Sequence, residues 1–134
     1  MKTGIYTNAF REFSLEEAMQ KIQSAGIQMV ELGCGEESGF AHCNPEELLK
    51  DGNRLSSFRG QIADHGLEIS ALSCHGNPVS PNEATKELSV RSMHNAVLLA
   101  EKLGLRNINC FSGCPGDWEG AGLANWVTVN WPMD

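Results

Sequence analysis

Hydrophobic residues along the chain follow two alternating spacings, one typical of strands and the other of helices. Four short apolar runs predict strands at residues 3–7, 28–32, 67–72 and 106–111. Between these runs the apolar residues recur every three or four positions, as they do on the buried face of a helix. The clearest helical stripe is Leu15, Ala18, Met19 and Ile22. Strands that alternate with helices predict an α/β fold, in which a parallel sheet is joined by right-handed crossovers.

The ends of the helices are marked by residues that satisfy free backbone groups. Ser14 and Glu17 have the spacing of a capping box, in which each side chain accepts a hydrogen bond from a free amide of the first turn. Residues 44–45, an Asn followed by a Pro, predict a second helix start. That helix is expected to break at residues 51–53 and then to resume. A third and longer helix is predicted over residues 82–103.

Composition and charge narrow the class of protein. Hydrophobic residues make up 41% and charged residues 20% of the 134 residues, the balance of a single globular domain over residues 1–134. The net charge is −7 and the basic residues do not cluster, so no nucleic-acid partner is expected. No apolar run approaches the roughly 18 residues of a membrane span, and no signal peptide is recognised. We therefore expect a cytoplasmic protein without a membrane partner, whose five cysteines are free thiols.

The number of predicted elements leaves two architectures open. A complete eight-fold β/α barrel takes about 250 residues, and four strands with three helical segments are about half of one. The chain is therefore predicted to be a partial TIM β/α barrel, its N-terminal half, or alternatively a small doubly wound α/β domain. In the second case residues 126–131 would supply a fifth strand, because their apolar and polar side chains alternate; they are equally compatible with an extended loop.

Candidate functional residues lie mainly where predicted strands end, because the carboxyl ends of parallel strands open into a ligand crevice. His75 and Asn77 follow the third strand and are predicted to contact a ligand; alternatively they pin their own turn. Glu31 lies on the second strand and either faces the ligand or pairs with a cation at the sheet. Ser112 follows the fourth strand, where its hydroxyl either binds substrate or belongs to a plain turn. Trp126 either stacks on the ligand or covers the core.

Two other kinds of site are suggested by residue types but not supported by spacing. The glycine-rich residues 33–39 follow a strand, but no helix begins where a dinucleotide loop needs one, and their acidic side chains would repel a pyrophosphate. Four residues at strand ends could approach each other in a metal- or redox-binding module: Cys34, Cys74, His75 and Cys110. No C-x2-C spacing supports zinc there, and burial as small apolar side chains is the simpler explanation of these thiols.

Five segments match the motifs of a known family, at residues 13–18, 26–33, 72–78, 107–116 and 125–132. They resemble the sugar phosphate isomerase/epimerase family, the xylose isomerase-like β/α barrels. The first two segments are generic for that superfamily. The His-Gly-Asn-Pro turn at residues 75–78 and the Ser-Gly-Cys-Pro-Gly loop at residues 112–116 are more specific. The resemblance implies a parent reaction of metal-assisted isomerisation or epimerisation, by proton transfer next to the carbonyl of a sugar.

The resemblance also implies which parts of such an enzyme lie elsewhere. Family members are about twice this length. They hold a divalent metal, Mn, Mg, Co or Zn, with two glutamates, an aspartate and a histidine at the ends of later strands. We therefore expect no cofactor, metal ligand or catalytic residue in this chain, and no turnover by the chain alone. It would instead supply one wall of a pocket for a small-molecule sugar or sugar phosphate, with His75 as the foremost contact.

Further expectations concern the isolated chain. A half-barrel has two open sheet edges, and open edges are templates for strand pairing, so self-association is predicted. Two hypotheses of other classes also remain. One is a self-sufficient small α/β binding domain without catalysis, and the other is the metal- or redox-binding module at the strand ends.

Overall fold

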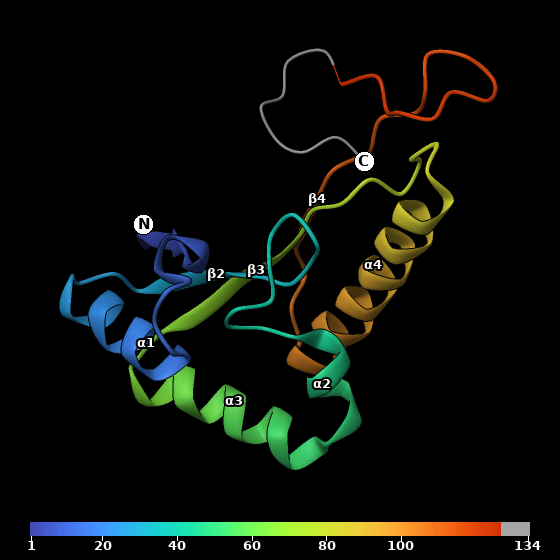
Figure 1. Cartoon of the computed structure of the whole chain (residues 1–134). Helices are drawn as coiled ribbons and strands as arrows, with labels where there is room; N and C mark the ends of the chain where they lie inside the picture. Colours follow the sequence, from blue (N-terminus) through green and yellow to red (C-terminus); the bar gives the residue numbers. More distant parts are fainter. Residues whose placement is uncertain (127–134) are drawn as a thin grey trace.

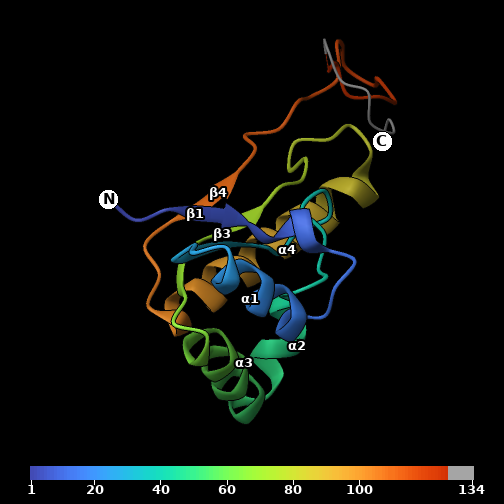
Figure 2. The ribbon, with the colours of Figure 1, turned by 90° about the vertical axis from the view of Figure 1, so that its left-hand side faces the viewer.

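The computed structural model describes residues 1–126 of the chain. It contains one parallel sheet with the strand order β1-β2-β3-β4. The strands are β1 (Gly4–Tyr6), β2 (Met29–Gly33), β3 (Glu68–Cys74) and β4 (Ile108–Cys110). The helices are η1 (Thr7–Phe10), α1 (Leu15–Ser24), α2 (Pro45–Lys50), α3 (Gly52–Asp64) and α4 (Glu83–Leu103). The long helices all lie on one side of the sheet (Figure 1, Figure 2).

The strand order distinguishes the two predicted architectures. A doubly wound sheet reverses its direction of growth, which places helices on both of its faces. Here each strand pairs with the next one along the chain, and the crossover helices stay on one side. Sequential winding of this kind is how a β/α barrel is built, and four strands are half of its eight. The prediction of a partial TIM β/α barrel is confirmed, and the doubly wound alternative does not fit the described strands.

The predicted helix boundaries are confirmed by their caps. Ser14 Oγ accepts a hydrogen bond from the amide of Glu17 at 3.3 Å, and the Ser14 amide donates to Glu17 Oε2 at 2.9 Å. Asn44 and Asp51 accept hydrogen bonds from the first turns of α2 and α3, so the second predicted helical segment is two helices. Gly104 ends α4 at a φ of 71°, a left-handed conformation that favours glycine.

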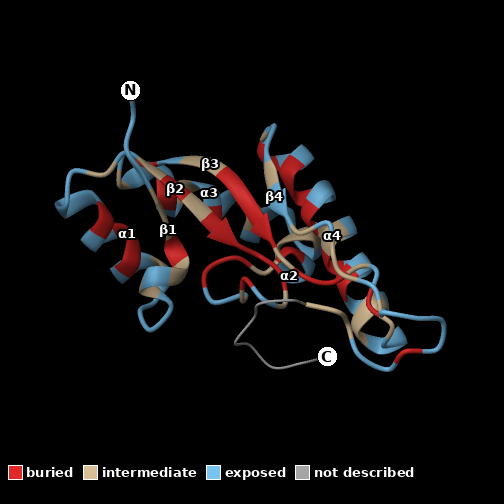
Figure 3. Ribbon diagram, turned by 90° about the horizontal axis from the view of Figure 1, so that it is seen from above, coloured by how far each residue is buried: buried red, intermediate tan, exposed pale blue. Residues whose placement is uncertain are grey.

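The core lies between the sheet and the helix layer. Its fully buried members from the sheet are Val30, Leu32 and Leu72, and those from the helices include Met19, Ile22, Ile62 and Leu99. Among residues 1–126, no long helix lies on the opposite face of the sheet, and Figure 3 looks onto it. Because successive side chains of a strand point to opposite faces, the residues between the core positions point toward this uncovered face. In a barrel that face would line the interior.

An irregularity in β3 sets which residues reach each face. Val30 pairs with Ile69, but the next residue, Glu31, pairs with Ala71, so Ser70 is an extra residue in β3. The Ser70 hydroxyl donates to the Val30 carbonyl oxygen at 3.0 Å. Ile69 and Leu72 both pack on the core although they are three residues apart. Regular alternation from residue 67 to residue 72, expected from the sequence, is therefore broken by this bulge.

Three further differences from the sequence expectations concern the ends of elements. Residues 7–10 form the short 3-10 helix η1, so residue 7, which was predicted to end the first strand, lies in a helical turn. β4 has three residues, fewer than the six predicted over 106–111. The proposed fifth strand at residues 126–131 lies almost wholly outside the described residues, as does the pairing of residues 127–130 that would support a self-sufficient domain. Among the described helices none is long and apolar enough to cross a membrane.

Candidate ligand-binding face at the strand ends

The uncovered face of the sheet carries a continuous set of polar and aromatic side chains. The strand register places Tyr6 beside Glu31, Gly33 beside Ser73, and Ser73 beside Asn109. These positions alternate with the core residues of the same strands, so their side chains point away from the helices. The carboxyl ends of the four parallel strands thus present chemistry on one face, as the sequence predicted from their order along the chain.

His75 follows β3 directly and lies at the mouth of this face. Its ring stacks on Phe111, with ring centroids 4.2 Å apart and planes 6° from parallel. Its Nε2 lies 3.4 Å from the hydroxyl of Ser73. Its backbone is fixed by the loop after β2: the His75 amide donates to Ser38 Oγ at 3.0 Å, and the Glu37 amide donates to the His75 carbonyl oxygen at 3.2 Å. The imidazole is therefore held in place and is still half-buried, not enclosed.

The stack extends to a second aromatic ring. Trp126 meets Phe111 edge to face, with centroids 6.3 Å apart and planes at 65°. Together His75, Phe111 and Trp126 form an aromatic wall, the name used below for these three residues. Phe111 was not identified as a site residue from the sequence. Its position, two residues after Asn109 on β4, was the available signal, because that spacing puts it on the same face.

Asn77 is occupied by the loop that follows β4. Its Nδ2 donates to the Cys114 carbonyl oxygen at 2.8 Å, and the Cys114 amide donates to its Oδ1 at 2.9 Å. Its own amide donates to Ser89 Oγ at 3.0 Å. With 5% of its surface exposed, Asn77 joins two loops and α4. The structure favours the alternative in which it pins its turn, and a direct ligand contact by Asn77 stays a prediction.

Glu31 and His75 do not lie together. Glu31 is opposite Ala71, whereas His75 is four residues further along β3, which is about 13 Å at roughly 3.3 Å per strand residue. Glu31 is half-buried, and within residues 1–126 its carboxylate makes no hydrogen bond or ion pair. It therefore lies deeper along the uncovered face, beside Tyr6, and neither of its predicted roles is decided by a contact.

Ser112 is exposed beyond the end of β4, and its hydroxyl makes no hydrogen bond to another described residue. Next to it, Gly113 has a φ of 89°, and a Cβ there would lie 2.7 Å from both Asn77 Oδ1 and Val79 Cγ2. Only glycine fits so close to the Asn77 loop. Gly113 thus sets the path that brings the β4 loop, with Ser112, alongside the β3 loop.

The residues present do not fit the family's metal. In the part of the chain that the structure describes, no group of three or more His, Cys, Asp or Glu side chains could hold a metal ion. His75, the best candidate ligand, has its ring against Phe111 and its Nε2 near a hydroxyl. Cys34 and Cys74 are buried within the core. The zinc variant of the sequence hypotheses therefore has no support among these residues.

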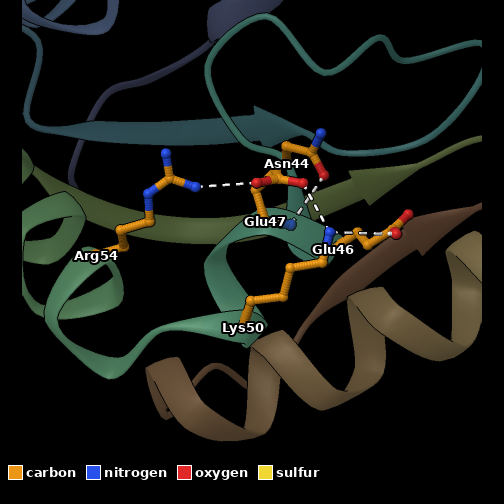
Figure 4. A network of polar contacts seen from close by, with 5 residues as sticks. All are labelled: Asn44, Glu46, Glu47, Lys50 and Arg54. Atoms are coloured by element: carbon orange, nitrogen blue, oxygen red, sulfur yellow. Dashed lines mark hydrogen bonds and ion pairs between the residues drawn. The ribbon is translucent and has the colours of Figure 1, made fainter.

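A polar network on the helix layer is separate from this face (Figure 4). Glu47 pairs with Lys50 at 2.8 Å and with Arg54 at 2.9 Å, and Lys50 also reaches Glu46 at 3.5 Å. The pKa of the Glu47 carboxyl is lowered mainly by the hydrogen bond from Lys50, and less by the one from Arg54. A cavity of about 370 Å³ lies beside the network, lined in part by Phe40. The charges of this network are exposed and paired with one another, which is typical of a surface network.

Comparison with known proteins agrees with this architecture. A family model described as xylose isomerase-like TIM barrel matches residues 19–129. The chain is also 29% identical over 135 residues to the uncharacterized protein YfiH of Bacillus subtilis (strain 168). That alignment covers 98% of this chain and 42% of YfiH, so the chain spans less than half the length of this relative.

Proposed function

The chain belongs to the xylose isomerase-like TIM barrel family, and on that premise we propose that it supplies one wall of a sugar-binding pocket. The parent reaction is isomerisation or epimerisation of a sugar or sugar phosphate, by proton transfer next to its carbonyl. The proton-transferring groups and the divalent metal belong to parts of the barrel beyond these strands. The chain on its own therefore binds and orients substrate and does not turn it over.

The observation that carries this proposal is the aromatic wall at the carboxyl ends of β3 and β4. A sugar ring has one face of C–H groups and a rim of hydroxyls, so it suits an aromatic surface edged by hydrogen-bonding groups. The wall offers the flat rings of Phe111 and Trp126. His75 Nε2 supplies the polar edge, with the buried Ser73 hydroxyl 3.4 Å behind it.

The role of each residue follows from its contacts. His75 holds a substrate hydroxyl through Nε2, and its imidazole can donate or accept according to the tautomer. The buried Ser73 hydroxyl, 3.4 Å from Nε2, helps to orient the imidazole. Ser38 and Glu37, in the loop after β2, hold the His75 backbone in place through two hydrogen bonds. Glu31 and Ser112 are proposed as weaker contacts, one deeper along the uncovered face and one at its outer rim.

Nuclear magnetic resonance of the 134-residue chain tests the proposal. Amide spectra are recorded with D-fructose, with D-fructose 6-phosphate and with inorganic phosphate, which separates recognition of the sugar from recognition of the phosphate. We expect shifts at Ser73, His75 and Phe111 with one of the sugars. His75→Ala should remove them, whereas the matched control His94→Ala, an exposed histidine on α4, should leave them unchanged.

Two results would count against the proposal. One is the absence of shifts at the aromatic wall with every probe at millimolar concentration. The other is an equal loss of binding in His75→Ala and in His94→Ala. Turnover of D-fructose 6-phosphate by the isolated chain supplied with Mn²⁺ would contradict the separate claim that the catalytic groups lie beyond these strands.

A further inference from the structure

Three cysteines lie side by side across three adjacent strands. Cys74 at the end of β3 is directly opposite Cys110 at the end of β4. On the other side, the β2–β3 ladder pairs Gly33 with Ser73, and the Cys34 amide then donates to the Ser73 carbonyl oxygen at 2.9 Å. This places Cys34 next to Cys74. All three occupy the same pleat position, on the helix side of the sheet and not on the face of the aromatic wall.

The spacing of the row suits disulfide formation. Neighbouring strands of a sheet lie about 4.8 Å apart. Disulfides span Cα separations of about 4.4 to 6.8 Å, so each adjacent pair can be bridged without large movement of the strands. Cys34 and Cys74 are also close enough for each thiol to shift the pKa of the other. The sequence analysis placed these thiols at strand ends that could approach each other, although 40 and 36 residues separate the neighbours; their order across the sheet comes from the strand register.

Only one end of the row is open to solvent. Cys34 is 0% and Cys74 is 2% exposed, whereas Cys110 is exposed on the edge strand β4. Two cysteines stand outside the row and serve as internal references. Cys43 is 1% exposed, and burial raises its pKa to about 12. Cys114 is half-buried and its thiol donates to Asn125 Oδ1 at 2.7 Å.

We propose that Cys34, Cys74 and Cys110 form a thiol-oxidation site, in which Cys110 reacts with a peroxide and Cys74 converts the product to a disulfide. The proposal is independent of any sugar ligand. Cys110 is oxidised first because it is exposed, so a peroxide reaches it without opening the core. The second step is favoured by the hydrogen bond from the Cys34 thiol, which lowers the pKa of Cys74 despite burial and the nearby charge of Glu36. The same contact, with burial, raises the pKa of Cys34.

The chemistry balances with hydrogen peroxide as the oxidant. The Cys110 thiol gives up its proton and the thiolate attacks one peroxide oxygen; the O–O bond breaks, Cys110 becomes a sulfenic acid, and the departing hydroxide takes up the thiol proton to leave as water. The Cys74 thiolate then attacks the Cys110 sulfur; the S–S bond forms, the S–O bond breaks, and the departing hydroxide takes up the Cys74 proton as a second water. Exchange follows when Cys34 attacks the Cys74 sulfur and transfers its own proton to the released Cys110 thiolate. The end state is a Cys34–Cys74 disulfide with Cys110 reduced again.

Peptide mass spectrometry of the full chain tests this sequence of steps. Dilute protein is treated with hydrogen peroxide, the remaining thiols are alkylated under denaturing conditions, and each cysteine is followed over time. We expect a Cys74–Cys110 disulfide first and a Cys34–Cys74 disulfide later, with Cys43 fully alkylated. In Cys110→Ser the buried pair should lose its oxidation, whereas the control Cys114→Ser should oxidise as the unaltered chain does.

Other outcomes would overturn the proposal. In the first, Cys110 of the unaltered chain stays a sulfenic acid or links two chains in dilute solution. In the second, the Cys34–Cys74 disulfide forms as fast in Cys110→Ser as in the unaltered chain. Oxidation of Cys43 at the rate of Cys74 would also do so, because it would mean that peroxide reaches the core by unfolding. Cys74→Ser gives an independent check, since it should leave Cys110 as a sulfenic acid that a dimedone probe captures. Circular dichroism establishes that each variant is folded; if Cys74→Ser is not, Cys110→Ser alone decides.

Discussion

Replacing Asn77 by Ala should detach the loop after β4 from the loop after β3. The substitution removes two hydrogen bonds to the Cys114 backbone, at 2.8 and 2.9 Å, from a side chain that is 5% exposed. Each such bond contributes about 1 kcal/mol net, and the partners left behind cost more if water cannot reach them. Cys114 is only half-buried, so water partly replaces the lost partner. We therefore expect a loss of about 2–3 kcal/mol in the free energy that holds this contact.

Two measurements separate local from global effects of this change. Urea unfolding followed by circular dichroism reports the free energy of unfolding of the whole chain. Hydrogen exchange of the Cys114 amide reports opening of the loop, and 2–3 kcal/mol corresponds to exchange roughly 30 to 150 times faster. Asn107→Ala, at an exposed position just before β4, is the matched control and should change neither. Unchanged protection of the Cys114 amide in Asn77→Ala, with a stability change below about 0.5 kcal/mol, would refute the reasoning.

Three further predictions follow from other contacts. Gly113→Ala should destabilise the chain by about 1–3 kcal/mol in urea unfolding, because the backbone has a φ of 89° there and an added Cβ would meet the Asn77 loop at 2.7 Å. The control Gly122→Ala should be near neutral in the same experiment, because Gly122 has no positive φ and no atom within 4 Å of an added Cβ. The hydrogen bond from Ser14 lowers the pKa of Glu17, so its stabilisation is present above the unfolded-state pKa of about 4.3 and is lost as pH falls through the lower folded-state value. Ser14→Ala should therefore flatten the acid limb of a stability–pH profile, and an identical limb in both proteins would contradict this. The open edges of β1 and β4 should give concentration-dependent association in sedimentation velocity, and a monomer at all concentrations would refute it.

Much of the fold was predictable because its signals are local. The capping box at Ser14, the break at residues 51–53 and the stop at Gly104 depend on residues within one helical turn, and all three are confirmed. The parallel sheet followed from the alternation of strands and helices. The length of β4 and the turn η1 could not be read in this way, because both depend on pairing and packing partners that the local pattern does not contain.

The candidate site was predictable in place but not in composition. His75 could be placed at a strand end, and the structure puts it there. Its partner Phe111 is 36 residues away, and the two rings meet only because β3 and β4 pair in the register that sets Ser73 beside Asn109. Asn77 has the residue type of a ligand contact, yet its amide is engaged by Cys114. Strand register and contacts between loops depend on the tertiary structure, and they cannot be read from a single sequence.

The bulge at Ser70 connects these observations, because it sets the phase of the end of β3. Before it, Ile69 packs on the core from an odd-numbered position; after it, Leu72 and Cys74 pack there from even-numbered ones. Without the extra residue the register after position 70 would slip by one, and every later side chain of β3 would change faces. Ser73 and His75 would then point into the helix layer, and Cys74 would leave its place between Cys34 and Cys110. One inserted residue thus assigns the imidazole to the ligand face and the thiol to the row behind it, so the two proposed sites share a single structural cause.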